Sequence, residues 1–164
     1  MTRTASALDA RRLAEITVAG WQTAYVGIVP DEVLARQSVE RHVEYFTSTE
    51  AFAPHMHTFV EEVAGKVVGY AHLGPVRPEP GEDLHGCELW GMYVENEYQG
   101  QGIGRALMAA CVELFRGMGC SRAYLWVMQD NSPARRFYES QGWSLDPSAA
   151  RLEPIAQVRY ELNL

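Results

Sequence analysis

The sequence predicts a layered α/β fold of the α+β kind, built on a mixed β-sheet, and three observations predict it. The chain has 164 residues, the size of one domain, so residues 1–164 are expected to form a single domain. Its hydrophobic fraction of 47% and charged fraction of 21% are typical of a globular protein. Along the chain, helical and strand patterns occur in the order α, α, β, β, β, α, β, α, β, which indicates helices layered on a mixed sheet.

Two helices are predicted at the start of the chain. Over residues 8–26, apolar residues such as Leu13 and Ile16 recur every three or four positions with charged residues between them, as on one face of a helix. Pro30 ends this helix, and Asp31 begins a second one. The expected apolar face of the second helix is Val33, Leu34 and Val39.

A β-hairpin and a central strand are predicted next. The segments HTFVEEVA and VVGYAHL are separated by a tight turn at 64–66, which is typical of a hairpin. Residues 74–86 are rich in proline and glycine and are expected to form a surface loop. The segment Cys87–Val94 is apolar on both sides, which predicts a central strand. Gly91 in its middle indicates a bulge or a close approach by another group.

The second half of the chain is predicted to contain two more helices and two more strands. A long helix is expected over 102–118, followed by a short buried strand over 123–127. A proline at the first helical position indicates another helix over 132–141. The alternating tail PIAQVRYEL, residues 154–162, predicts the last strand.

Charge and composition argue against several classes of function. The chain carries 14 basic and 21 acidic residues, for a net charge of −7, whereas nucleic-acid binding usually needs a basic face. Its longest apolar run, 106–112, is too short to span a membrane, and no hydrophobic signal core begins the chain. Cys87, Cys111 and Cys120 show no C-x-x-C spacing. We therefore expect reduced thiols and a cytoplasmic location.

The segment QGQGIG, residues 99–104, lies between a predicted strand and a predicted helix. Helix N-termini have unpaired N–H groups and a positive dipole end, so this turn predicts an anion site of the pyrophosphate kind. A dinucleotide fingerprint would need its third glycine where Arg105 stands, and no Gly-Lys-Ser/Thr sequence follows. From the glycines alone, a helix start that needs glycine only for packing remains an alternative.

Two motifs together resemble the GNAT family of N-acetyltransferases. The family's acetyl-CoA motif, Q/R-x-x-G-x-G/A, matches Gln99, Gly102 and Gly104. A second motif, N-x-x-A-x-x-F-Y-E-x-x-G-F/W, matches Asn131, Ala134, Phe137, Tyr138, Glu139, Gly142 and Trp143. The W-x-x-x-Y-x-G-I-x-P pattern, common at a helix end in the family, matches Trp21, Tyr25, Gly27, Ile28 and Pro30.

The resemblance implies a mostly antiparallel sheet of about six to seven strands flanked by about four helices, with two central parallel strands splayed apart. Residues 1–5 leave little room for the family's first strand. Acetyl-CoA is the implied cosubstrate, and its pantetheine arm is expected to lie along the central strand as an added strand would. Trp21 and Tyr25 are expected on the acceptor side. The cofactor-binding residues implied are Met92, Tyr93, Val94, Gln99, Gly100, Gln101, Gly102, Ile103, Gly104, Arg105 and Asn131. Asn131 also fits a plain turn residue.

The resemblance also implies two catalytic residues for direct attack of a primary amine on the thioester. Tyr138 matches the family's general acid, which protonates the leaving thiolate; the alternative is a buried core tyrosine. Glu88, at the start of the central strand, is the candidate base, acting directly or through water. A strand-end glutamate that faces solvent or a neighbour fits Glu88 equally well. The other position where the family carries a glutamate is Trp126 in this chain.

The sequence leaves the acceptor open. A small-molecule amine and a protein or peptide amine both fit, with the acidic balance favouring a cationic amine, and a homodimer is consistent with the family. His55 and His57 alternate, but a zinc site needs three or four ligands, so no metal is expected. The alternative function is a non-catalytic acyl-CoA-binding sensor or interaction module of the same fold.

Overall fold

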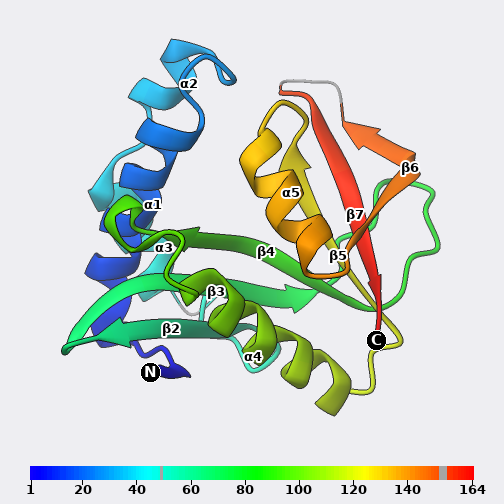
Figure 1. Cartoon of the computed structure of the whole chain (residues 1–164), viewed down its shortest axis with the longest axis horizontal. Helices are drawn as coiled ribbons and strands as arrows, with labels where there is room; N and C mark the ends of the chain where they lie inside the picture. The colour runs from blue at the N-terminus through cyan, green and yellow to red at the C-terminus, as the bar shows by residue number, and fades with distance from the viewer. Residues whose placement is uncertain (49, 152–154) are drawn as a thin grey trace.

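The computed structural model describes residues 1–48, 50–151 and 155–164, and its centre is one sheet with the strand order β1-β2-β3-β4-β5-β7-β6 (Figure 1). Only β4 and β5 pair in parallel, and every other neighbouring pair is antiparallel. The predicted mixed, mostly antiparallel sheet is therefore confirmed. The strands are β1 Thr2–Thr4, β2 His57–Val63, β3 Lys66–Pro75, β4 Cys87–Val94, β5 Arg122–Met128, β6 Ser144–Arg151 and β7 Gln157–Asn163.

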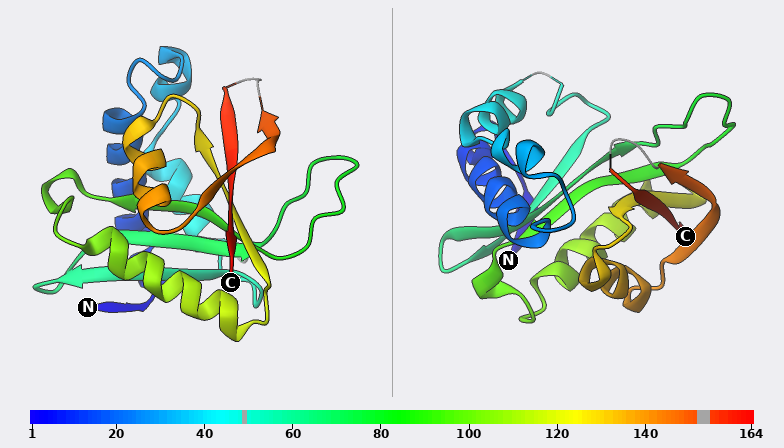
Figure 2. Two further views of the ribbon diagram at one scale, coloured as in Figure 1. Left: turned by 45° about the vertical axis from the view of Figure 1, so that its right-hand side comes forward. Right: turned by 90° about the horizontal axis from the view of Figure 1, so that it is seen from above.

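Helices cover both faces of this sheet (Figure 2). On one face, α1 and α3 enclose a core with β2 and β3 that includes Leu13, Phe46 and Val60. On the other face, α4 and α5 pack on the middle strands around Leu107 and Leu125. None of the helices among the described residues has the length and apolar character needed to cross a membrane. The helices are α1 Ala10–Ala24, α2 Asp31–Ala35, α3 Val39–Thr47, α4 Ile103–Gly117 and α5 Ser132–Ser140, with short 3-10 turns η1 Ala7–Asp9 and η2 Asn96–Tyr98.

The predicted second helix is divided into α2 and α3, so its predicted extent is wrong. The Ser38 hydroxyl accepts a hydrogen bond from the backbone N–H of Arg41, which starts α3 as a separate helix. Val33 and Leu34 are only half-buried, and the buried residue of this region is Phe46. The apolar spacing continues across the start of α3, so it does not reveal the break between the two helices that Ser38 makes.

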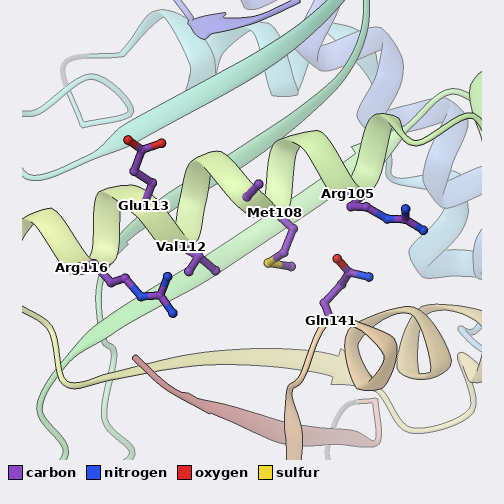
Figure 3. Close-up of a pocket in the computed structure, with 7 residues that line it drawn as sticks. Arg105, Met108, Val112, Glu113, Arg116 and Gln141 are labelled. Atoms are coloured by element: carbon purple, nitrogen blue, oxygen red, sulfur yellow. The ribbon is translucent and has the colours of Figure 1, made fainter.

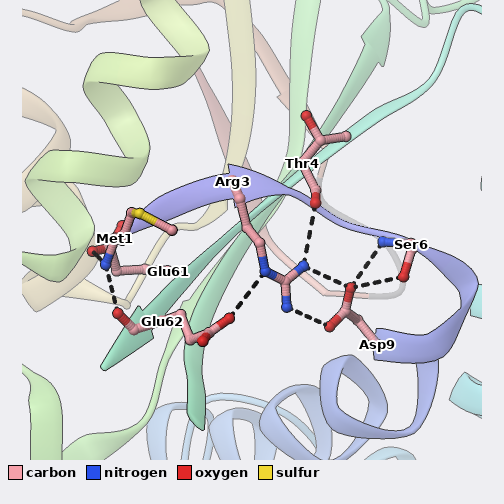
Figure 4. Close-up of polar contacts among 7 residues, drawn as sticks. All are labelled: Met1, Arg3, Thr4, Ser6, Asp9, Glu61 and Glu62. Atoms are coloured by element: carbon pink, nitrogen blue, oxygen red, sulfur yellow. Dashed lines mark hydrogen bonds and ion pairs between the residues drawn. The ribbon is translucent and has the colours of Figure 1, made fainter. Parts of the chain in front are cut away.

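The first strand fits into very few residues because ion pairs fix it to the sheet edge (Figure 4). Thr2–Thr4 pairs with β2. The Arg3 guanidinium donates to both Asp9 carboxylate oxygens, each at 2.9 Å, and to Glu62 at 3.0 Å. Because these bonds join the strand to η1 and to β2, three residues suffice for the strand that the sequence left little room for.

The hairpin β2–β3 and the central strand β4 have the predicted positions. The expected irregularity lies one residue earlier than Gly91, because Gly91 pairs with His72 while Leu89 pairs with Leu73, so that Trp90 bulges between them. Of the predicted last strand, Pro154 lies outside the described residues, and the strand is confirmed from Gln157 onward, where β7 begins. The edge strand β6 was not predicted, because its sequence contains a proline and does not alternate.

A disulfide joins Cys87 at the start of β4 to Cys120 just before β5, with Cα atoms 6.2 Å apart. The predicted reduced state of these two thiols is therefore wrong. Parallel pairing sets Cys87 opposite Ala123, which brings together two cysteines 33 positions apart. Such a contact leaves no local sequence pattern. Cys111 is a free thiol on the buried face of α4, and burial raises its pKa to about 12. The cytoplasmic location, which rested partly on reduced thiols, stays a prediction.

Candidate active site

The glycine turn before α4 forms an open, positively polarised cradle. Gly100 and Gly102 have φ angles of 75° and 87°, values that favour glycine. A Cβ atom added at either position would meet nothing within 4 Å. Gly102 is the N-cap of α4, whose first turn carries no acidic residue. The first backbone N–H groups of the helix lie beyond the reach of intrahelical partners, so the turn can bind an anion such as a diphosphate.

Gly104 has a different reason to be glycine. A Cβ atom there would lie 3.3 Å from the Phe137 ring of α5, which is tighter than ordinary van der Waals contact. The packing explanation considered for the whole motif therefore applies to Gly104. It does not apply to Gly100 or Gly102, where the space is open.

The central strands separate next to this cradle. β4 and β5 pair at three positions only, from Cys87 opposite Ala123 to Leu89 opposite Leu125, although both strands continue beyond them. Figure 1 shows β5 and β7 turning away from β4. Residues 92–94 stay paired to β3 on their other side. Their edge toward β5 lacks a strand partner, and an extended ligand can bind along it as an added strand.

The gap between the separated strands is a cavity of about 480 Å³, a size typical of small-molecule sites. It is bounded by the end of α1, β4, the glycine turn, β5, α5 and β7. Gln101, Ile103, Trp21 and Glu88 are predicted site residues that do not line it. The predicted residues that do line it are Tyr25, Met92, Tyr93, Val94, Gln99, Gly100, Gly102, Gly104, Arg105, Asn131 and Tyr138.

Tyr138 lines this cavity from α5, with 9% of its surface exposed. Burial raises the pKa of its phenol, which keeps the hydroxyl protonated at neutral pH. Among the residues that the structure describes, none forms a hydrogen bond with this hydroxyl. Buried Tyr70 and Tyr160, by contrast, bond to Thr17 and to Glu139. Because the residue lines the cavity and its hydroxyl has no partner among the described residues, Tyr138 has a proton available for a bound molecule.

Asn131 caps α5 with its side chain. Its Oδ1 atom accepts a hydrogen bond from the backbone N–H of Ala134 at 3.2 Å. This is the bond expected of an N-cap, which agrees with the turn-residue interpretation. Asn131 is also buried and lines the cavity, so one residue fixes the start of the helix that carries Tyr138 and faces the site.

An aromatic cluster closes the cavity at the end of α1. The Tyr93 hydroxyl accepts a hydrogen bond from Trp21 Nε1 at 3.1 Å, and the Trp21 ring lies edge-on to Tyr25. A Cβ atom at Gly20 would lie 2.6 Å from the Tyr93 ring, so glycine is needed for this approach. Trp21 thus lies outside the cavity lining and bonds to Tyr93, which is part of the lining, whereas Tyr25 lines the cavity directly.

Glu88 is buried, with a side chain 1% exposed, but its carboxylate faces Arg77. It accepts hydrogen bonds from the Arg77 backbone N–H at 2.8 Å and from Arg77 Nε at 3.1 Å, and it is also paired with Nη2. The Arg77 guanidinium lies over the Trp90 ring, 4.0 Å from its centre. The structure therefore does not bring Glu88 and Tyr138 to one cavity wall.

Sequence reasoning missed two wall residues, Trp90 and Trp126. Leu89 and Leu125 are the last paired positions of β4 and β5, so these tryptophans are next on the two strands, where the separation begins. A guanidinium lies 4.0 Å from the ring centre of each, from Arg77 on Trp90 and from Arg151 on Trp126. No local pattern in the sequence indicates this role, because the two tryptophans become neighbours only through the register of β4 on β5.

A second, shallower groove runs along the exposed side of α4 (Figure 3). Arg105, Met108, Val112 and Arg116 line it from α4, and Gln141 faces them from the end of α5. Arg105 and Gln141 also line the main cavity, so the groove continues the site along α4.

Comparison with known proteins agrees with this architecture. The sequence profile of the Acetyltransferase (GNAT) family matches residues 21–143. The chain belongs to the GNAT family. YuaI, an N-acetyltransferase of Bacillus subtilis (strain 168), is 32% identical over 158 residues, which cover 96% of this chain and 86% of that protein. The enzyme class follows from the family: the chain is an acetyl-CoA-dependent N-acetyltransferase whose acceptor is an amine.

Two further similarities cover less of the chain or show the fold alone. The spermine/spermidine N(1)-acetyltransferase of Bacillus subtilis (strain 168) is 31% identical over 50% of this chain and 55% of its own length, so this GNAT chain spans about half of that relative. The crystal structure of PaiA N-acetyltransferase from Thermoplasma acidophilum, in complex with coenzyme A, has a TM-score of 0.78 at 18% identity. The alignment covers 100% of this chain and 98% of that one.

Proposed function

We propose that the cavity between β4 and β5 is the catalytic centre, where an acetyl group passes from acetyl-CoA to a primary amine by direct attack in a ternary complex. The observation that carries this proposal is the hydroxyl of Tyr138, a largely buried residue that lines the cavity and has no hydrogen-bond partner among the described residues. It lies in one cavity with the glycine cradle and the unpaired edge of β4.

The residues present fit coenzyme A. The open space at Gly100 and Gly102 leaves room for a diphosphate against the backbone N–H groups at the start of α4. Arg105, which lines the cavity from the first turn of that helix, adds a charge-assisted contact. Backbone groups of Met92 and Val94 bind the pantetheine arm as they would bind another strand.

The reaction needs one bond formed and one broken. The neutral amine nitrogen bonds to the acetyl carbonyl carbon, and the bond from that carbon to sulfur breaks with its electron pair on sulfur. Tyr138 donates its proton to the sulfur, because a thiolate with an ordinary pKa of about 8.5 leaves more readily once protonated. The nitrogen releases a proton to water, and water returns a proton to Tyr138. The products are an N-acetylated amine and the free thiol of coenzyme A.

The role of Glu88 depends on whether the amine loses its proton before it enters the cavity or inside it. Among the described residues, no aspartate or glutamate lines the cavity, and the Glu88 carboxylate is held by Arg77. We infer that the amine enters already deprotonated and that Glu88 is a positioning residue, which holds Arg77 against Trp90. The base role expected from the sequence stays a prediction.

The test is the Tyr138→Phe variant. Turnover measured as thiol release from acetyl-CoA with a panel of primary amines is expected to fall about 10²- to 10⁴-fold, the range for a lost general acid. Coenzyme A affinity measured by calorimetry is expected to change little, because the phenol protonates sulfur only as it leaves. Tyr124→Phe is the matched control, since Tyr124 is a buried tyrosine outside the cavity lining.

An unchanged rate in Tyr138→Phe would refute the acid role. Coenzyme A binding without thiol release for any amine in the panel would refute the transferase proposal and support the binding-module alternative.

A further inference from the structure

We propose that the acceptor is a primary monoamine with a flat aromatic body, and that Trp90 and Trp126 bind that body. The inference rests on the proposed function, because it assigns the acceptor end of the same cavity. It departs from the expectation that the net charge favours a cationic acceptor, since the charges at the cavity differ from those of the whole surface.

The first argument is the position of the two tryptophans. They follow the last paired residues of β4 and β5, so they lie where the separated strands begin to form the cavity. Both are half-buried and line it. Two indoles from neighbouring strands at the base of a cavity provide aromatic surface on which another ring can stack or pack edge-on.

The second argument is that both indoles are held in place. The Trp90 Nε1 atom donates a hydrogen bond to the Pro75 carbonyl oxygen at 3.1 Å, and Arg77 stacks on its ring. Arg151 stacks on Trp126 and is itself paired with Glu79. Side chains restrained in this way lose little further freedom when a ligand binds, which favours a rigid, flat partner.

The third argument is electrostatic. The cavity lining contains no carboxylate among the described residues. Each arginine that stacks on one of the tryptophans is already paired with a carboxylate. Arg77 is paired with Glu88, and Arg151 is paired with Glu79. A polyamine would bring a second ammonium group into this cavity, where it would lose water without gaining a counter-ion and would lie near two guanidinium groups. A monoamine that reacts in its neutral form carries no such cost.

The test compares three amines as acceptors for thiol release from acetyl-CoA: 2-phenylethylamine, n-butylamine and spermidine. We expect kcat/KM for phenylethylamine to exceed that for butylamine about ten-fold, as expected for one good aromatic contact, and spermidine to be the poorest. In Trp90→Leu and Trp126→Leu, the preference for phenylethylamine over butylamine is expected to fall toward one. Phenylalanine at either position is expected to restore part of it.

The matched control is Phe52→Leu, which removes an aromatic ring from the core on the α1 and α3 face. This variant is expected to keep the preference of the wild-type protein. Spermidine or butylamine used as well as phenylethylamine by the wild-type protein would overturn the inference and leave the transferase proposal standing. A preference that survives loss of both tryptophans would also overturn it. No thiol release with any amine would overturn the proposed function and, with it, this inference.

Discussion

Replacing His72 with glutamine is expected to remove a large part of the acid sensitivity of the fold. His72 is 5% exposed on β3. Its Nδ1 and Nε2 atoms each lie 2.8 Å from a hydroxyl oxygen, those of Thr58 and Tyr45. Burial, with a smaller contribution from the Arg77 charge, lowers its pKa from 6.5 to about 4. The neutral ring is therefore the form that the folded protein accommodates.

The sign follows from proton linkage. Below pH 6.5 the unfolded chain protonates this histidine, whereas the folded protein does not until about pH 4. The contribution of His72 to the free energy of unfolding is therefore fully present above pH 6.5, and it is lost as the pH falls from 6.5 to about 4. Between pH 7.5 and pH 4.5 the loss is about 2.5 kcal/mol of unfolding free energy, at roughly 1.4 kcal/mol per pH unit.

Urea unfolding at these two pH values measures the effect. At pH 7.5, His72→Gln is expected to be less stable than the wild-type protein by about 1–3 kcal/mol, because glutamine does not reproduce both hydrogen bonds. At pH 4.5 this difference is expected to shrink by about 2.5 kcal/mol, or to reverse. An equal stability difference at the two pH values would refute the reasoning.

Two further predictions concern the site. Gly102→Ala is expected to weaken coenzyme A binding, measured by calorimetry, by about five- to ten-fold, because alanine at a φ of 87° costs about 1–2 kcal/mol and disturbs the start of α4; Gly117→Ala in the same helix, where a Cβ has open space, is expected to leave the affinity unchanged. Glu88→Gln is expected to lower kcat/KM by a factor that stays constant with pH, because a positioning role does not titrate as a base does, whereas a loss that disappears as the pH rises would support the base role instead.

Local signals were sufficient for much of this fold. The hairpin turn, the glycine turn before α4 and the proline-marked start of α5 each depend on residues next to one another in the sequence, and all are found where the patterns indicate. Backbone conformation in such turns is set by the residues themselves. The mixed character of the sheet followed from the order of these elements along the chain, whereas the edge strand β6 and the spatial order of the strands were not predicted.

The missed features depend on contacts between distant segments. The disulfide between Cys87 and Cys120 depends on the pairing of β4 with β5, and the ion pair between Glu88 and Arg77 depends on the path of the loop that precedes β4. Burial of Glu88 was foreseeable from its apolar neighbours, but its partner was not. A carboxylate in an apolar strand has the same sequence signature whether it faces a substrate or an arginine.

Because β4 and β5 pair at only three positions, the sheet consists of two parts joined over a short stretch. One part contains β1 to β4, and the other contains β5, β7 and β6. The Cys87–Cys120 disulfide links the two parts at the end where β4 and β5 are paired. A change in the angle between the two parts would move their unpaired ends further than their paired ends. A covalent link at the paired end therefore restrains the angle between the two parts, and with it the separation of β4 and β5 at the cavity.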